Sequence, residues 1–444
     1  METNIFTQGS VVKNLIRFSL PYLLSCFLQT FYGLADLFIV GHFNGAASIS
    51  AVSTGSQVMH MFTVVIVGLA VGSSVTISRL LGEKREKDIP YIIGNTSVFF
   101  LIFSVISSFL LILAIPFLLE LLAVPLEAID ETRQYLTVCF MGSIFIAGYN
   151  VISNIFRGLG DSKTPMYFVA LAGIINVGLD YLFIGPWHLK AIGAAYATVL
   201  AQALSVVFAI VYAMRKMKFI ALQKHHFYLQ KKYLRELLKI GLPIALQDGF
   251  IQVSFLLITV IANKRGVDVA AAVGIVEKVI SFMFLVPSAM LSGVSTICAQ
   301  NAGAGFHQRA VKTLYAGIMI SSGVGFVFCL LSQLLATDIM EMFTREETVI
   351  IMGRQYLKAY SIDCILAAVH FCFSGFFTAY QKSYISFIHN VFSIVLVRIP
   401  GAYLAASLFK DTLFPMGLAA PAGSLLSIFI CLYFFYQYNA MLTV

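Results

Sequence analysis

Long apolar runs, one after another, are the feature of this sequence that most restricts how the chain can fold. The run from Leu15 to Phe43 contains a single carboxylate, and runs of similar length follow it. A bilayer core about 30 Å thick needs about 20 apolar residues per helix. Because no water reaches the backbone there, each run is expected to be a helix, and the runs are too long for barrel strands. With 59% hydrophobic and 11% charged residues among 444, and a mean hydropathy of +0.89, the chain is expected to be an all-α polytopic membrane protein without a separate soluble domain.

Twelve such spans are predicted. They lie near residues 14–41, 50–80, 90–117, 129–157, 164–185, 190–214, 235–263, 268–299, 308–336, 349–380, 384–408 and 415–442. The segments between them are short, except for a basic connector at 215–234. This connector divides the chain into an N-lobe of six helices at 1–214 and a C-lobe of six helices at 235–444.

The Lys and Arg residues are distributed unevenly between alternate connecting segments. Of the 29 in the chain, nineteen lie on the side that holds the N-terminus and five lie within spans. The other side holds the remaining five, namely Lys190, Lys264, Arg265, Arg345 and Lys410. Because cytoplasmic loops are enriched in Lys and Arg, both termini and the connector are expected in the cytoplasm, with the protein in the plasma (cell inner) membrane. Topology accounts for the charge of the connector, so nucleic acid is not an expected partner.

The two halves resemble each other. RFSLPYLLSCFLQTF in the first span recurs as KIGLPIALQDGFIQVSF in the seventh, with Pro21 matching Pro243. Further matches follow at similar offsets. Two six-helix halves of like topology are typical of transporters whose substrate site lies between lobes that rock for alternating access. The prolines are expected to bend their helices, or to serve packing alone.

Two carboxylates, Asp36 and Asp180, lie within first-half spans and have no counterpart in the second half. An acid inside a membrane helix costs about 2.5–3.5 kcal/mol on insertion scales and indicates a functional site. Asn176 precedes Asp180 by one helical turn, and Thr198 is expected at a similar depth in the next span. Oxygen ligands of this kind suit a hard cation such as sodium. The alternative for Asn176 and Thr198 is hydrogen bonding between helices.

The chain resembles the multidrug and toxic compound extrusion (MATE) transporters over essentially its whole length. The resemblance rests on the twelve-span double repeat, on SLPYLLSCFLQTFYGLADLFIVGH, on RGLGDSKTP, and on NVGLDYLFI followed by GAAYATVLAQ. It implies an antiporter that exports amphipathic, mainly cationic, organic compounds in exchange for protons or sodium ions. It also implies a coupling site, which would hold a metal ion only if sodium is the coupling ion, formed by Asp36, Asn176, Asp180 and Thr198. The residues that it places near this site, as part of the substrate cavity, are Gln29, Tyr32, Tyr135 and, as a looser match, Asn154.

The second half departs from one branch of the family. NorM-like members carry a glutamate in the seventh helix, whereas this chain has Asp248 and Gln252 in the matching stretch. The pattern is therefore more similar to the DinF-like branch. Together with Asp363 and Arg398, these two residues are the polar candidates of the second lobe. His370 and His389 are expected to be hydrogen-bonded core or cavity residues.

Two other classes of function are less well supported. A lipid-linked saccharide flippase of related architecture would be expected to line its cavity with arginines that hold a diphosphate, and only Arg398 lies well inside a second-half span. A membrane enzyme is not indicated, because the sequence has no zincin motif, nucleophile elbow or phosphate-binding glycine loop. The protein is expected to work as a monomer on amphipathic small molecules within membrane lipid, without a cofactor other than its coupling ion.

Overall fold

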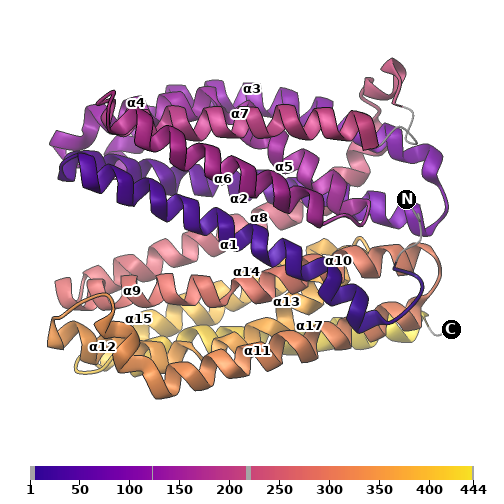
Figure 1. Cartoon of the computed structure of the whole chain (residues 1–444). Helices are drawn as coiled ribbons and strands as arrows, with labels where there is room; N and C mark the ends of the chain where they lie inside the picture. Colours follow the sequence, from indigo (N-terminus) through magenta and orange to yellow (C-terminus); the bar gives the residue numbers. More distant parts are fainter. Residues whose placement is uncertain (1–5, 123, 217–221, 443–444) are drawn as a thin grey trace. The chain divides into compact units, whose positions relative to one another are not determined.

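The computed structural model describes residues 6–122, 124–216 and 222–442, and within these ranges every regular element is a helix (Figure 1). In chain order they are α1 (Val11–Phe43), α2 (Ala46–Gly82), η1 (Glu86–Asp88), α3 (Ile89–Leu121), η2 (Leu126–Ala128), α4 (Ile129–Met141), α5 (Ser143–Gly158), α6 (Lys163–Ile184), α7 (Lys190–Lys216), η4 (Lys224–Phe227), α8 (Lys231–Asn263), α9 (Val267–Met283), α10 (Leu285–Gly303), α11 (His307–Glu341), α12 (Glu347–Tyr360), α13 (Asp363–Ala379), α14 (Ser383–Ser393), η5 (Ile394–Arg398), α15 (Ile399–Leu408), α16 (Phe414–Gly417) and α17 (Ala419–Leu442). The short element η5 is a π-helical turn.

The twelve predicted spans are confirmed. Eleven stretches of the described chain are helical, apolar and long enough to cross a bilayer, and α4 and α5 form a twelfth span with a bend of 49°. The bend falls at Gly142, where a Cβ atom would come within 2.4 Å of Val199 in α7. Glycine at this position therefore lets the bent span lie against α7.

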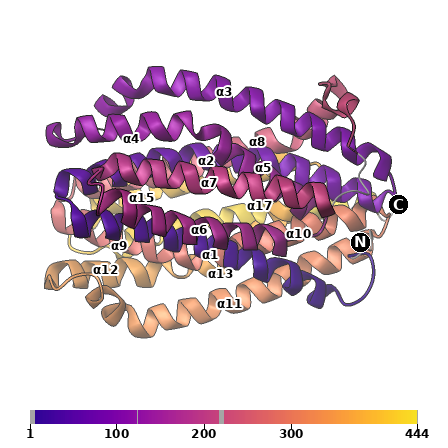
Figure 2. The ribbon, with the colours of Figure 1, turned by 45° about the horizontal axis from the view of Figure 1, so that its top comes forward.

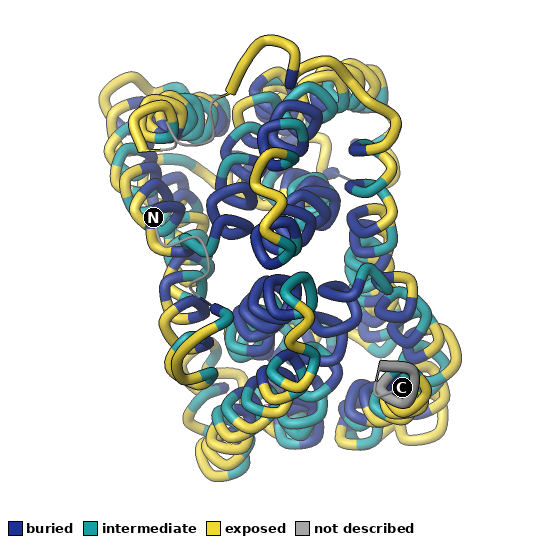
Figure 3. The backbone as a smooth tube through the Cα atoms, turned by 90° about the vertical axis from the view of Figure 1, so that its right-hand side faces the viewer, coloured by how far each residue is buried: buried dark blue, intermediate teal, exposed yellow. Residues whose placement is uncertain are grey.

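The outer surfaces of the helices carry the side chains expected to face lipid. On α3, large apolar residues are exposed at every fourth position, namely Leu101, Val105, Phe109 and Leu113. Figure 3 shows the same pattern, with exposed positions on the outside of each bundle and buried positions inside it. An apolar stripe of this length would be a liability in water, so it is expected to lie in the bilayer.

Contacts divide the chain into two compact units, which we call the N-unit (Leu24–Gly241) and the C-unit (Met1–Leu23 with Leu242–Val444). The unit boundaries fall inside α1 and α8, beside Pro21 and Pro243. Because proline has no N–H group, each removes one backbone hydrogen bond from its helix near the boundary. The predicted lobe limits at 1–214 and 235–444 describe the sequence repeat and stay a prediction.

In each unit, side-chain contacts hold the segment that precedes the first helix of a sequence repeat, which is α1 in the first repeat and α8 in the second. In the C-unit, the buried Phe6 donates its backbone N–H to Gln300 Oε1 at 3.0 Å. Arg309 donates to the carbonyl oxygens of Gln8 at 2.7 Å and Gly9 at 2.9 Å. These bonds hold the segment before α1 against α10 and α11.

In the N-unit, the segment before α8 is held against α3. Gln230 donates its backbone N–H to Asn95 Oδ1 at 2.6 Å, and Tyr91 stacks on Tyr233 with ring centroids 5.3 Å apart. A Cβ atom at Gly94 would come within 2.2 Å of the backbone oxygen of His226. The close approach of η4 to α3 therefore requires glycine at this position.

Candidate cation and substrate site

The two predicted acids are neighbours in the N-unit. Asp36 of α1 is 6% exposed and Asp180 of α6 is 0% exposed, and their carboxyl groups interact electrostatically. Both oxygens of Asp180 and Oδ1 of Asp36 are buried, and none has a hydrogen-bond partner among the described residues. Two ionised carboxylates can only accept hydrogen bonds, so a shared proton or a cation is what would join this pair.

Asn176 and Thr198 add further buried polar atoms without partners. The side-chain nitrogen and oxygen of Asn176 and the hydroxyl of Thr198 are buried, and none is hydrogen-bonded within the described chain. Asn176 lies one turn before Asp180 on α6, and α7, which carries Thr198, packs along α6 (Figure 2). Buried polar groups are normally hydrogen-bonded, because leaving them unpaired costs free energy. The four predicted coupling residues therefore share one property: each has buried polar atoms without a hydrogen-bond partner in the described chain.

The donor set of these residues fits a proton or a hard monovalent cation. Carboxylate, amide and hydroxyl oxygens are ligands that hard cations accept. In the part of the chain that the structure describes, no group of three or more His, Cys, Asp and Glu side chains could hold a metal ion. A sodium ion bound by Asp36 and Asp180 with neutral oxygens fits the chemistry of these four residues.

The aromatic candidates lie beside the acids. Tyr32, one turn before Asp36 on α1, interacts electrostatically with Asp36 and with Tyr149 of α5. Tyr135 of α4 also interacts with Asp36, and its hydroxyl lies 3.1 Å from Ser56 Oγ. These tyrosines place phenol rings near the buried Asp36 carboxyl, in an arrangement suited to an organic cation.

The two amide candidates differ in where their side chains bond. Gln29 of α1 contacts Tyr149, which brings it to the edge of the same cluster. Asn154 is buried in α5, and its Nδ2 donates to the backbone oxygen of Asn150 at 2.9 Å. The structure therefore brings Gln29 to the tyrosines beside the acids, while the Asn154 amide bonds within its own helix.

Gln202 of α7 also belongs to this cluster and was not among the residues predicted from the sequence. Gln202 follows Thr198 by one turn on α7 and contacts Tyr32, and its Oε1 is buried without a partner in the described chain. The i, i+4 spacing from Thr198 was the signal that could have identified it. The polar cluster thus extends over one turn of α7, from Thr198 to Gln202.

In the C-unit, two of the four polar candidates come together. Arg398 of η5 interacts electrostatically with Asp363 of α13 and also with Glu277 of α9, whose partner the sequence had not indicated. Arg398 donates to the Tyr360 hydroxyl, and its guanidinium carbon lies 4.7 Å from the centre of the Phe255 ring. In the described chain no ion pair within 4.0 Å joins Arg398 to either acid.

The other two second-lobe candidates are not part of that cluster. Asp248 of α8 accepts a hydrogen bond from the side chain of its neighbour Gln247 at 3.4 Å. Gln252 is half-buried one turn later on the same helix. Among the described residues, no hydrogen bond or ion pair joins Asp248 or Gln252 to Asp363 or Arg398.

His370 and His389 are hydrogen-bonded core residues, as expected. Nε2 of His370 lies 3.2 Å from Ser424 Oγ, and Nε2 of His389 lies 2.9 Å from Ser374 Oγ. Both histidines are buried, and their ring centroids are 5.6 Å apart.

The chain matches a known family twice. The family model MatE matches residues 21–182 and again residues 243–404, so the two matches begin at the paired prolines and confirm the internal repeat. The chain is 27% identical over 407 residues to "Probable multidrug resistance protein YpnP" of Bacillus subtilis (strain 168), covering 90% of this chain and 89% of that protein. It is 25% identical over 380 residues to "Multidrug export protein MepA" of Staphylococcus haemolyticus (strain JCSC1435), covering 84% and 82%.

Solved structures share the fold. A structure described as the outward-facing conformation of a multidrug resistance MATE family transporter of the MOP superfamily superposes with a TM-score of 0.93 at 20% identity, covering 100% of this chain and 99% of that chain. A MOP superfamily transporter from Pyrococcus furiosus matches with the same score, identity and coverage. At this identity the likeness shows the fold alone.

Proposed function

We propose a transport function from the premise that this chain belongs to the MatE family of membrane transporters. The protein exports amphipathic organic compounds, chiefly cations. It takes up protons or sodium ions in exchange, by alternating access. The protein is a multi-pass membrane transporter and not an enzyme. Export of drugs is supported by the names of two relatives, a multidrug resistance protein and a multidrug export protein.

The single observation that carries the coupling proposal is the set of unpaired atoms around the acid pair. Asp36, Asp180, Asn176 and Thr198 all have buried polar atoms without hydrogen-bond partners among the described residues. A proton or sodium ion would relieve the repulsion of the two carboxylates and satisfy these atoms. A bound cation shifts the equilibrium between two conformations only by its difference in affinity for them, and exchange requires such a difference.

The proposed preference for cations rests on the charge and the rings of the same cluster. Tyr32 and Tyr135 both interact electrostatically with Asp36, and phenol faces attract organic cations. A planar lipophilic cation can compete with the coupling ion for this environment, whereas an anion would meet two carboxylates. Competition for one site is sufficient to link substrate release to ion entry.

A lipid-linked saccharide flippase remains the alternative function. Its diphosphate would need arginine, and Arg398 is the candidate from the second half. Arg398 lies beside Glu277 and Asp363, two acids that would repel a diphosphate. The neighbourhood of Arg398 therefore supports the antiporter over the flippase.

We place the protein in the plasma membrane, as a functional monomer with both termini in the cytoplasm. The support is the Lys and Arg distribution, with nineteen of 29 on the side of the N-terminus. The fused repeat also provides two six-helix halves within one chain, so a second copy is not required to build a two-lobed transporter.

The test is uptake of ethidium into proteoliposomes, with pH and sodium gradients imposed separately. We expect uptake to follow one gradient, to be lost in Asp36→Asn, and to persist in Asp338→Asn, an exposed acid of α11 that serves as the matched control. An anionic dye of similar size tests the class of substrate. Uptake that ignores both gradients would contradict coupled antiport, and better uptake of the anion would contradict the cation preference.

A further inference from the structure

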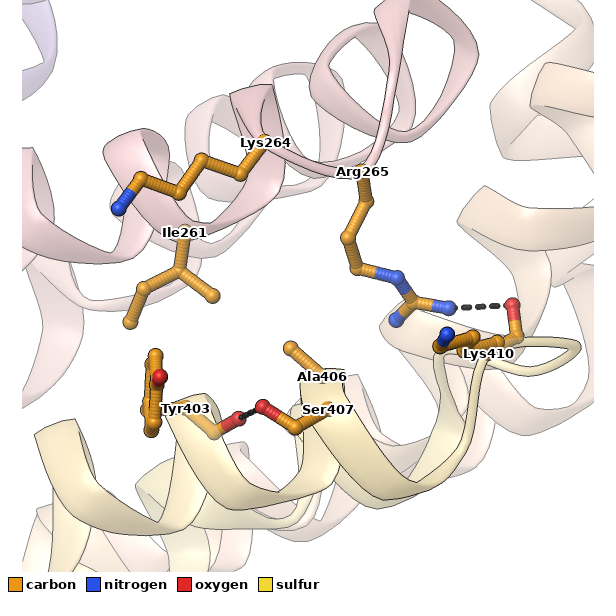
Figure 4. A pocket seen from close by; sticks show the side chains of 7 residues that line it. All are labelled: Ile261, Lys264, Arg265, Tyr403, Ala406, Ser407 and Lys410. Atoms are coloured by element: carbon orange, nitrogen blue, oxygen red, sulfur yellow. Dashed lines mark hydrogen bonds between the residues drawn. The ribbon is translucent and has the colours of Figure 1, made fainter.

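A basic pocket of about 350 Å³ lies at one end of the C-unit, between the ends of α8 and α15 (Figure 4). Its volume is within the range of small-molecule sites, about 300–1,000 Å³. The residues that line it are Ile261, Lys264, Arg265, Tyr403, Ala406, Ser407 and Lys410. Three of these seven side chains are cationic, and none is acidic.

These three basic residues are unusual because they lie on the side of the membrane where the chain has few basic residues. The loop count places only five basic residues on the outer side, and Lys264, Arg265 and Lys410 are three of them. They come from two loops far apart in the sequence, and all three line one pocket. Basic residues are disfavoured on the outer side in general, so the presence of three of them around one pocket calls for a specific reason.

Helix capping explains only part of this cluster. Arg265 Nη2 donates to the backbone oxygen of Phe409 at 3.0 Å and to that of Lys410, which satisfies carbonyls beyond the end of α15. The other terminal nitrogen of Arg265, Nη1, is buried and has no hydrogen-bond partner in the described chain. Asp411 is the acid that interacts electrostatically with Arg265. One buried guanidinium nitrogen and two lysines are thus left for an anion.

The remaining lining residues suit a ligand that also has an apolar part. Ile261 and Ala406 form apolar walls, and Tyr403 is 57% exposed. Leu408, at the end of α15, is also exposed. Both helices end here, at the depth where a membrane span gives way to the headgroup region, and tyrosine is enriched at that depth. A group with a phosphate and an attached acyl part matches this division between cationic and apolar walls.

We propose that this pocket binds an anionic phosphate group at the outer membrane surface, with Lys264, Lys410 and Nη1 of Arg265 as its donors. Guanidinium and ammonium groups are the usual partners of phosphate in proteins. The phosphate can come from the headgroup of an anionic lipid or from free phosphate in solution. The pocket lies in the C-unit alone, so this inference is independent of the acid pair in the N-unit.

The experiment uses the purified full-length protein in neutral detergent and native mass spectrometry. Phosphatidylglycerol, phosphatidylcholine and inorganic phosphate are titrated separately. We expect phosphatidylglycerol to bind, and Lys264→Gln and Lys410→Gln each to weaken its binding about fivefold. Phosphatidylcholine, which has no net charge, is expected to bind less well and to be insensitive to both substitutions. Arg265 is left unchanged because it also holds the loop after α15.

The matched control is Arg345→Gln, which removes an exposed charge from another loop of the same predicted side. Binding of phosphatidylglycerol should be the same in this variant and in the unmodified protein. If inorganic phosphate instead binds with the same lysine dependence and displaces the lipid, the source is free phosphate and the phosphate site stands. The last comparison is between the unmodified protein and the Lys264→Gln, Lys410→Gln double variant. If the double variant binds phosphatidylglycerol as well as the unmodified protein does, and also binds phosphate as well, the proposal is overturned.

Discussion

Asp36 and Asp180 come from different helices of the N-unit and meet as a buried carboxyl pair, with three of their four carboxyl oxygens lacking a hydrogen-bond partner in the described chain. Two charges this close to each other in a low-dielectric region are costly unless a proton or a cation joins them. The pair is therefore expected to act as one unit.

Substitutions of Asp36 and Asp180 are predicted to have non-additive effects on efflux. Asp36→Asn and Asp180→Asn should each abolish gradient-driven efflux while leaving expression intact, because each removes charge at nearly constant volume and lowers an insertion cost. The double variant should be little worse than either single one, since coupled residues do not add. Efflux per folded transporter is the measurement. A single variant with wild-type coupled efflux would remove that residue from the coupling site.

Gln202 is expected to contribute to the same site. Gln202→Leu removes a buried oxygen that has no partner in the described residues and lies near Tyr32, so the apparent affinity for the coupling cation should fall about fivefold, as expected for the loss of about 1 kcal/mol. Asn154→Leu is the comparison, because the Asn154 amide bonds within α5. The cation dependence of efflux distinguishes the two. An equal fall in both variants would show that Gln202 has no special role.

Asp161 in the loop between α5 and α6 predicts a pH-dependent stability. Partial burial raises its pKa, but the hydrogen bonds from Thr164 and the ammonium of Lys216 at 3.0 Å outweigh burial, so the pKa lies below its usual value. A carboxyl with a lowered pKa stabilises the folded state above its ordinary pKa of about 3.9, and that stability is lost as pH falls through the folded pKa.

Asp161→Asn should therefore lower the free energy of unfolding by about 1.5–3 kcal/mol at neutral pH, as expected for hydrogen bonds to a charged group. The difference should shrink as the medium becomes acidic. Thermal unfolding in detergent at several pH values measures this, with Asp338→Asn as the exposed control. A destabilisation that does not change with pH would mean that the carboxylate charge is not what holds this loop.

The proposed orientation, with the connector in the cytoplasm, predicts how introduced cysteines react. In a variant without the seven native cysteines, Lys224→Cys in the connector should resist a membrane-impermeant thiol reagent in intact cells, whereas Lys410→Cys should react. Both positions are exposed, so access differs only by the side of the membrane. Labelling of Lys224→Cys from outside would show that the chain has the opposite orientation. The basic pocket would then lie at the cytoplasmic face.

The sequence by itself determined the class of fold, the number of spans and the repeat. These follow from local properties, because any apolar run longer than about 20 residues must be helical in a bilayer. The match between Pro21 and Pro243 revealed the duplication, and the family model begins at the same two residues. Asp36 and Asp180 could be singled out because a carboxylate within an apolar run is costly wherever the helix packs.

Only the tertiary structure decided which side chains meet. Three findings depend on how helices rotate about their axes and pack. They are the contact of Gln202 with Tyr32, the proximity of Glu277 to Arg398, and the pocket that Lys264 and Lys410 both line. The sequence pattern does not specify these rotations, because a lipid-facing helix and a core helix can have equally apolar compositions. The same reason explains why the contact boundaries inside α1 and α8 could not be predicted, since they depend on contacts between segments distant in sequence.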